Sequence, residues 1–213
     1  MVCQSSSGGI RANTAVFKGR FYFEVQVLSD QLMQIGWCTL ATPFNRDGGV
    51  GDDDTSYAFD GFRVKKWHVD SQDYGEQWAV GDVIGTLIDL TAKEISFYRN
   101  DKDLGVAFKG IKTGPNMAYF PAIFMSEGTQ AIFNFGQRPF RHQLECFAVS
   151  EPESRIKNYG IVAAYVMDLL KHYVFDYFEA PDLNEDLRTL VVSTIWDYLT
   201  PLLLNDPHHY LME

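Results

Sequence analysis

The sequence has few cysteines and no long apolar run. Its three cysteines, Cys3, Cys38 and Cys146, are an odd number, and no two of them form a C-x-x-C pair. The first residues also lack the basic and apolar regions of a secretory signal, so we expect a reduced, cytoplasmic protein. Cys38 lies in an apolar segment without a basic neighbour, and we expect it to be a small core residue. No stretch of about 18 apolar residues occurs, which argues against a membrane-spanning helix.

Positive charge is scarce as well. Lys and Arg together number 18 against 28 Asp and Glu, which gives a formal net charge of −10. Because an acidic surface repels phosphate, we expect neither nucleic acid nor an anionic membrane as a partner. The chain is 46% hydrophobic and 15% aromatic. This composition is sufficient for a buried core, and a high aromatic share is typical of strands and of binding surfaces.

Motifs for catalysis and metal binding are missing from the sequence. There is no G-x-S-x-G, P-loop or H-E-x-x-H motif, and the five histidines lack the spacing of a zinc site. The glycine-rich stretch 47–51 is followed by three aspartates, which would repel a bound phosphate. Asp89 comes nearest to an isolated catalytic carboxylate, but at a strand end we expect a turn cap or a partner for a base. We therefore expect no catalytic site, no cofactor and no metal.

Two patterns of apolar residues divide the chain near residue 150. Before it, short β-type runs are separated by Gly, Asp and Asn; Phe21 to Val27 alternates apolar and polar residues most clearly. The other predicted strands are 33–38, 83–90, 94–99, 104–108, 119–125 and 130–135. Many short strands with close turns predict a mainly β fold, an antiparallel two-sheet sandwich over residues 1–146.

The C-terminal part has helical spacing instead. After a predicted linker at 147–155, apolar residues in 156–213 recur at intervals of three and four, with a helix stop and N-cap at Pro181-Asp182. We predict a tail made of two antiparallel helices. Because two lone helices cannot shield both apolar stripes, we expect the tail to dock on the sandwich or on other domains of the parent protein.

We predict that two long stretches between predicted strands, 41–56 and 63–77, are loops that bind a protein or peptide. Both mix aromatic rings with charges, which supply contact area and register at interfaces. Three aspartates favour a basic or amide-rich segment, and an arginine can pair with a carboxylate in a bidentate manner. The candidate contact residues are Arg46, Asp52, Asp53, Asp54, Tyr57, Trp67 and Tyr74. For the aromatic residues, the alternative is structural packing.

Several segments, in order, resemble SPRY domains over residues 8–141. They include Phe21-Tyr22-Phe23-Glu24-Val25, Ile95-Ser96-Phe97-Tyr98-Arg99-Asn100, Leu104-Gly105-Val106-Ala107-Phe108, Tyr119-Phe120-Pro121-Ala122 and Phe133-Asn134-Phe135-Gly136. Three segments, Ser56 to Trp78, Met33 to Thr39 and Pro115 to Pro121, together look most like the SPRY domain of the RING-finger ubiquitin ligase in the Kip ubiquitination-promoting complex. The stretch around Tyr57 to Trp78 also resembles one SPRY domain of ryanodine receptors.

The resemblance implies a non-catalytic module for substrate or partner recognition within a larger RING-type E3 ubiquitin ligase, whose RING zinc ligands are absent from this sequence. SPRY domains commonly hold ligands in loops at one end of the sandwich, which adds Met125, Ser126 and Glu127 to the predicted site. The alternative is an internal scaffold domain of a giant protein such as a ryanodine-receptor-like channel. A recognition module should expose aromatic groups on its loops, and a scaffold should expose apolar area on helices or sheet faces.

Overall fold

The structure is a computed structural model that describes residues 1–3, 7–44, 48–114 and 117–149. Arg46, most of the predicted linker and the predicted helical tail lie outside the described residues. The proposed division into sandwich, linker and tail therefore stays a prediction. Within the described ranges, no helix has the length and apolar character needed to cross a membrane.

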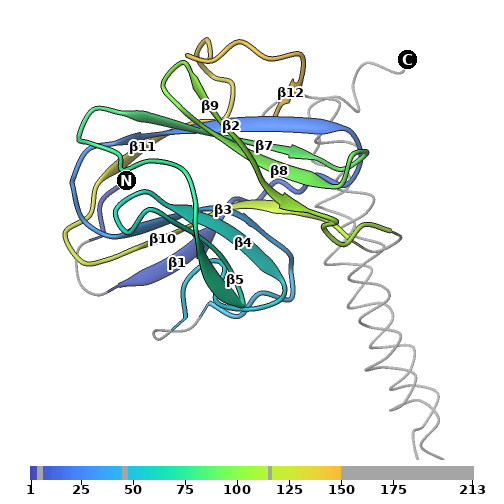
Figure 1. The fold of residues 1–213 in the computed structure, drawn as a ribbon, viewed down its shortest axis with the longest axis horizontal. Coiled ribbons are helices and arrows are strands. Elements are labelled where there is room, and N and C mark those ends of the chain that lie inside the picture. Colours follow the sequence, from blue (N-terminus) through green and yellow to red (C-terminus); the bar gives the residue numbers. More distant parts are fainter. Residues whose placement is uncertain (4–6, 45–47, 115–116, 150–213) are drawn as a thin grey trace, which may run out of the picture. The chain divides into compact units, whose positions relative to one another are not determined.

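Two sheets face each other across the core (Figure 1). Sheet I contains, in spatial order, β1 (Gly8–Arg11), β10 (Phe120–Met125), β3 (Met33–Cys38), β4 (Ser56–Asp60), β5 (Lys65–His68) and β6 (Asp70–Asp73). Sheet II contains β11 (Ala131–Asn134), β2 (Arg20–Val27), β7 (Val83–Asp89), β8 (Glu94–Arg99) and β9 (Lys102–Lys109). All neighbours on these two paths pair antiparallel. The predicted mainly β fold of two antiparallel sheets is confirmed for the described residues.

The core lies between the sheets and follows the alternation of the strands. On β3, Met33, Ile35 and Trp37 turn inward and are completely buried. The Trp37 indole donates a hydrogen bond of 2.9 Å to the Thr86 hydroxyl on β7. Its ring also meets Phe23 of β2 edge-on, with 5.1 Å between the ring centroids. Trp37 therefore joins the two sheets by packing and by a satisfied buried polar contact.

Residues 63–77 were predicted as a loop, and this prediction is wrong. The structure places β5 and β6 there, paired from Lys65↔Asp73 to His68↔Asp70. Both strands consist largely of polar or charged residues, so they lack the apolar alternation that marks a half-buried strand. A single residue, Val69, separates them and adopts a positive φ of 63°. This conformation is rare for a β-branched residue, and no turn motif in the sequence predicts it.

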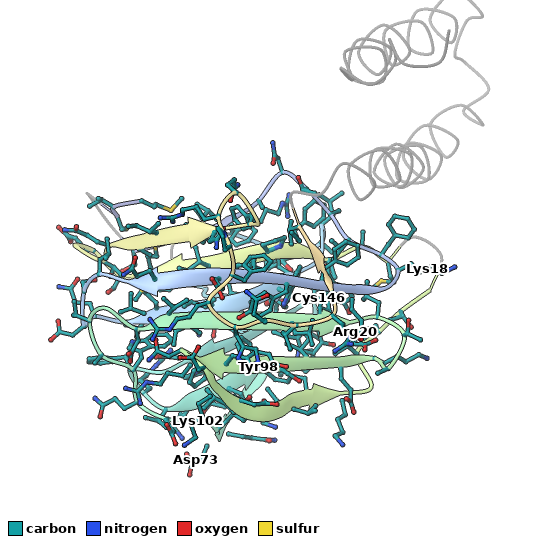
Figure 2. All side chains as sticks on the ribbon, turned by 90° about the horizontal axis from the view of Figure 1, so that it is seen from above. Lys18, Arg20, Asp73, Tyr98, Lys102 and Cys146 are labelled. Atoms are coloured by element: carbon teal, nitrogen blue, oxygen red, sulfur yellow. The ribbon has the colours of Figure 1, made fainter. Side chains whose placement is uncertain are left out.

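A strap of residues 136–149 crosses the outer face of sheet II. It ends in β12 (Phe147–Ala148), which falls at the start of the predicted linker and pairs parallel with β2. Beneath the strap lies an apolar cluster, whose members Tyr98 and Cys146 are labelled in Figure 2. The carboxylate of Glu24 accepts backbone hydrogen bonds from Arg141 and His142, at 2.7 and 3.1 Å. Strand β2 thus anchors the strap through a buried acid.

Candidate functional site

The candidate site lies on the outer face of sheet I. Directly opposed residues in an antiparallel sheet share a face. One row across this face is therefore Arg11, Ala122, Gly36, Ala58 and Trp67. A neighbouring row pairs Gln34 with Phe124. The small residues in the centre of the first row leave room for a segment to lie across the sheet.

A covering loop, residues 48–55, occupies part of that space. Gln34 is only 2% exposed and donates from Nε2 to the Asp52 carboxylate, at 3.2 Å. The Gly51 amide donates to the Ser56 hydroxyl, at 2.7 Å. Gly51 has a φ of 98°, and a Cβ there would lie 2.5 Å from the Trp67 carbonyl oxygen. Both the positive φ and the close approach to Trp67 require glycine at position 51, and this glycine allows the loop to pack directly against β5.

The three aspartates of the predicted site mainly organise this loop. Asp52 accepts the Gly49 amide at 2.7 Å in addition to Gln34. Asp53 accepts the Thr55 amide at 2.6 Å. Asp54 is exposed and pairs with Lys112 at 3.0 Å, and this hydrogen bond and charge lower the pKa of Asp54. In the described part of the chain, no group of three His, Cys, Asp or Glu residues is suited to hold a metal ion.

Trp67 lies at the surface of this face beside Arg63, which sequence reasoning missed. The β4–β5 turn is capped by Asp60, whose carboxylate accepts the backbone amides of Phe62 and Arg63 at 2.9 and 3.0 Å. The same carboxylate pairs with Arg63 Nε. The Arg63 guanidinium carbon then lies 4.0 Å from the Trp67 ring centroid. Asp60 followed by Gly61 is a turn signal in the sequence, but no local signal indicates the contact between Arg63 and Trp67.

A second aromatic group on this face was also missed. Phe44 covers Gly9 of β1 so closely that a Cβ at Gly9 would lie 2.4 Å from the ring. The Arg11 guanidinium lies 5.5 Å from the ring centroids of both Phe44 and Phe120, and it donates to the Leu40 carbonyl at 3.1 Å. Phe44 stands within the predicted loop 41–56, where an aromatic ring beside charges was the available signal.

Four of the predicted contact residues do not lie on the outer face of sheet I. Tyr57 and Met125 are 5% and 2% exposed in the core, because strand alternation turns both inward, so neither offers area to a partner. Tyr74 also packs inward: it meets Phe59 edge-on at 5.4 Å, and its hydroxyl donates to the Gly105 carbonyl at 2.6 Å. Ser126 bonds to the Thr129 hydroxyl at 2.9 Å. The structure therefore does not bring Tyr74 together with Trp67.

Glu127 remains exposed in the turn that follows β10. Met125, the last residue of that strand, pairs with Met33, the neighbour of Gln34 in sequence. The turn therefore begins beside the part of sheet I that carries the covering loop. Of the predicted residues, Trp67 and the three aspartates thus belong to the outer face of sheet I and its covering loop, and Glu127 belongs to the turn at the end of β10.

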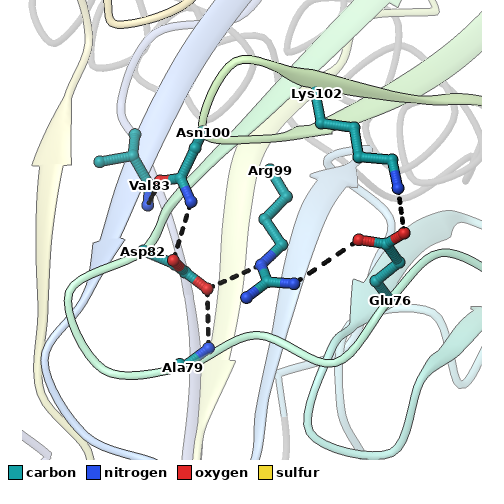
Figure 3. A network of polar contacts seen from close by, with 7 residues as sticks. All are labelled: Glu76, Ala79, Asp82, Val83, Arg99, Asn100 and Lys102. Carbon is teal, nitrogen blue, oxygen red and sulfur yellow. Dashed lines mark hydrogen bonds and ion pairs between the residues drawn. The ribbon is translucent and has the colours of Figure 1, made fainter.

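A polar network fixes the connection between the two sheets (Figure 3). Asp82 accepts from Arg99 Nε at 2.7 Å, from Asn100 Nδ2 at 2.8 Å and from the Ala79 amide at 2.8 Å. Arg99 also lies 3.5 Å from Glu76. Burial raises the pKa of Asp82, but the hydrogen bonds and the positive charge outweigh burial and leave the pKa below its usual value. This network serves the fold rather than the candidate site.

Two structural interpretations from the sequence are confirmed. The Asp89 carboxylate accepts the Thr91 and Ala92 amides at 3.0 and 2.8 Å and pairs with Arg20 at 3.2 Å, as expected for a turn cap and charge partner. Cys38 is completely buried, and burial raises the pKa of its thiol to about 12. Such a thiol is not reactive at neutral pH.

Comparisons with known proteins agree with this geometry. The SPRY domain model matches residues 20–138. The chain is 49% identical over 138 residues to the E3 ubiquitin-protein ligase RKP of Arabidopsis thaliana, covering 64% of this chain and 11% of that protein. It is 36% identical to the ATP-dependent RNA helicase Ddx1 of Drosophila melanogaster, covering 63% of this chain and 18% of that protein. It is 30% identical to the ATP-dependent RNA helicase DDX1 of Xenopus laevis, covering 66% of this chain and 19% of that protein. The chain thus spans less than a fifth of the length of these curated relatives. It belongs to the SPRY domain family.

Proposed function

We propose that this chain is a non-catalytic recognition module that binds a substrate or partner protein for a larger RING-type E3 ubiquitin ligase in the cytoplasm. Membership of the SPRY family supports a role in protein–protein interaction. The similarity to a plant protein described as an E3 ubiquitin-protein ligase supports the ligase context.

The observation that carries the proposal is the preformed outer face of sheet I. The buried side chain of Gln34 ties down the covering loop, and Asp60 orients Arg63 against Trp67. A surface held in this way loses little conformational entropy when a partner binds. An aromatic ring and a guanidinium within a polar rim are also the groups that contribute most to binding energy at protein interfaces.

Proximity labelling in the cytosol tests the proposal. The chain carries the labelling enzyme as wild type, as Trp67→Ala and as Val106→Ala, which alters an exposed residue on β9 of the other sheet. We expect a set of labelled proteins that is lost in Trp67→Ala and kept in Val106→Ala, because truncating a central anchor costs about 2 kcal/mol or more. Both variants are first checked by thermal unfolding. The same labelled set in all three proteins would contradict recognition through this face.

Ubiquitin transfer is a separate test of the non-catalytic part of the proposal. We expect no chain formation when the 213-residue protein is combined with activating and conjugating enzymes, because it lacks the zinc ligands of a RING. A complete ligase with its own RING serves as the positive control. Ubiquitin chains above the background of the enzymes alone would overturn this part.

The scaffold alternative is favoured by one observation. An apolar groove of about 170 Å³ opens beside β1 and β11, where Ile10, Phe133 and Phe135 contribute to its lining. Ile10 and the neighbouring Ile132 of β11 are 41% and 36% exposed. If the labelled set survives Trp67→Ala but is lost in Ile10→Asp or Ile132→Asp, contact with another domain through this edge replaces recognition through sheet I.

A further inference from the structure

Strand β1 lies at one edge of sheet I, and its outer edge is unpaired (Figure 1). The Ala12 amide donates to the Pro121 carbonyl at the start of the β1–β10 ladder, at 2.8 Å. Opposed residues in an antiparallel ladder alternate between exchanging and not exchanging hydrogen bonds. Ile10 therefore bonds to β10, whereas Gly9 and Arg11 turn their backbone groups toward the free edge. Among the described residues, none bonds to these amides and carbonyls of Gly9 and Arg11.

The neighbouring edge of sheet II shows how this fold satisfies such groups. Just before β11, the Leu28 amide donates to the Gln130 carbonyl at 3.0 Å, so the same alternation turns Ala131 to the free edge. The N-terminal residues lie there in extended form. The Ala131 amide donates to the Met1 carbonyl at 3.1 Å, and the Met1 ammonium group donates to the Ala131 carbonyl at 2.7 Å. In the described part of the chain, β1 has no corresponding segment.

The edges on the other side of the sandwich are protected. Strand β6 consists of polar residues and has an aspartate at each end, which discourages pairing with another strand. On β9, side chains from sheet I already occupy two backbone acceptors. The Gly105 carbonyl accepts from the Tyr74 hydroxyl and the Ala107 carbonyl accepts from the Lys66 ammonium group, both at 2.6 Å.

Strand β1 lacks these protections. Its sequence, Gly-Gly-Ile-Arg, carries a single charge. The Arg11 guanidinium is drawn over the outer face of the sheet, where it donates to the Leu40 carbonyl at 3.1 Å and lies 5.5 Å from the ring centroids of Phe44 and Phe120. It therefore does not shield the edge. An unprotected strand edge is the site at which an extended polypeptide adds to a sheet.

The apolar groove of about 170 Å³ lies directly beside this edge. Ile10 and Ala12 of β1 line it together with Phe133 and Phe135, and Ile10 is 41% exposed. Alternate residues of an added strand turn to the same face of the sheet, so one of them would reach the groove. An apolar cavity of roughly 150 Å³ can hold a benzene ring. One large apolar side chain, such as Leu or Phe, thus suits the groove.

We propose that β1 is a docking edge for an extended segment of a partner polypeptide, which adds to sheet I as a further strand and places one large apolar side chain in the groove. The formal net charge of −10 disfavours a second copy of this chain and favours a segment without net negative charge. The inference goes beyond the proposed function, because β10, β3 and β4 separate β1 from the strand that carries Trp67.

Selection of displayed random linear peptides against the 213-residue chain tests this edge. We expect enriched peptides without net negative charge that share one large apolar residue. Their binding should slow hydrogen exchange at the Gly9 and Arg11 amides, with no change at the Ile10 amide, which is already bonded. N-methylation of the peptide amides, one at a time, should weaken binding about tenfold at alternate positions, because alternate amides face β1.

Two matched variants make the test specific. Ile10 and Val106 are 41% and 37% exposed, and each lies on an edge strand. Ile10→Asp places a charge in the groove and should weaken peptide binding about tenfold or more, whereas Val106→Asp should leave it unchanged. Thermal unfolding shows whether both variants are folded. If Ile10→Asp does not fold, the exchange and N-methylation measurements decide the question.

Several results would overturn the docking edge. They are recovery of no peptide, peptides that leave exchange at Gly9 and Arg11 unchanged, and equal binding to wild type and folded Ile10→Asp. Sedimentation that shows a dimer lost in Ile10→Asp would identify a second copy as the occupant instead. Peptides that need Trp67 but not Ile10 would support the proposed function alone, and peptides that need Ile10 but not Trp67 would support the docking edge alone.

Discussion

The two sheets differ in the segment that covers the outer face of each. Each carries a segment across its outer face, and each anchors that segment through a buried polar side chain: Gln34 under the covering loop and Glu24 under the strap. The strap closes over an apolar cluster that includes Tyr22, Leu87 and Tyr98. The covering loop is instead rimmed by aspartates, and the Trp67–Arg63 pair remains partly exposed beside it.

The chemistry of the anchors explains this difference. Glu24 lies beside Tyr22, whose hydroxyl donates to it at 3.2 Å. Burial first, and then the Glu24 charge, raise the pKa of Tyr22, so its hydroxyl stays protonated and available as a donor. The Tyr22 ring also meets Phe140 of the strap edge-on, at 4.9 Å. The strap is thus part of a small second core, whereas the covering loop is a shaped surface.

Removing the strap anchor should have the largest effect. Glu24→Ala leaves the Arg141 and His142 amides without their acceptor, and we expect a loss of about 3 kcal/mol in the free energy of unfolding. Urea unfolding measures it. Glu94→Ala is the matched control, because Glu94 pairs with Lys109 at 3.6 Å near the surface and should cost less than about 0.5 kcal/mol. Equal effects of the two variants would show that Glu24 does not anchor the strap.

Removing the loop anchor should cost less stability and act locally. Gln34→Ala deletes the hydrogen bond to Asp52, and we expect a loss of about 1–2 kcal/mol. Hydrogen exchange should become faster at the amides of Gly51 and Val69, which bond to Ser56 and to the covering loop. The amides of Arg141 and His142, under the other anchor, provide the internal control. If they exchange faster to the same extent, the two segments are not independent.

A smaller effect is expected for the network that joins the sheets. Because hydrogen bonds hold the pKa of Asp82 below its ordinary value of 3.8, its contribution to stability is complete above that value and is lost as the pH falls through the lower, folded-state pKa. Asp82→Asn should therefore weaken the acid dependence of the urea midpoint. Near neutral pH, Asp82→Asn should lower the free energy of unfolding by less than about 1 kcal/mol, since Arg99 is partly exposed. An unchanged acid dependence would contradict this assignment.

The smallest effect is expected at the tip of the β5–β6 hairpin, and its sign is opposite. Val69 is 56% exposed with a φ of 63°, a costly conformation for a β-branched side chain. Val69→Gly should relieve this strain and, after the entropic cost of glycine, stabilise the fold by about 0.5 kcal/mol. Thermal unfolding measures it, with Val106→Gly on β9 as an exposed control that should destabilise. A loss of stability in Val69→Gly would show that the native conformation is unstrained.

Strands with a clear apolar alternation could be predicted from the sequence. The predicted ranges 33–38 and 94–99 coincide with β3 and β8, and the predicted 83–90 differs from β7 by one residue. Strands β1 and β4 were not predicted because both are short: β1 has four residues, of which two are glycines, and β4 has five residues, of which only Tyr57 and Phe59 are large and apolar. The hairpin β5–β6 escaped because it is an edge element with polar residues on both faces.

The candidate site was predicted only in part. Trp67 and the aspartates were recognised because aromatic and acidic residues clustered in sequence. The contribution of Arg63 depends on a buried acid three residues earlier and on a ring across the turn. No local sequence pattern predicts these contacts of Arg63. The strained one-residue turn at Val69 could not be predicted from the sequence either.

The sequence by itself determined the β-sandwich, through the period of its apolar residues, and the absence of recognisable catalytic motifs. Tertiary structure decided which polar side chains are buried. The Gln34 side chain binds Asp52, 18 positions away, and the Glu24 carboxylate binds the Arg141 amide, 117 positions away. A polar group can be buried only where a partner satisfies its hydrogen bonds. That partner comes from a distant segment, so the position of the buried polar groups is set by how the chain packs and not by their neighbours in sequence.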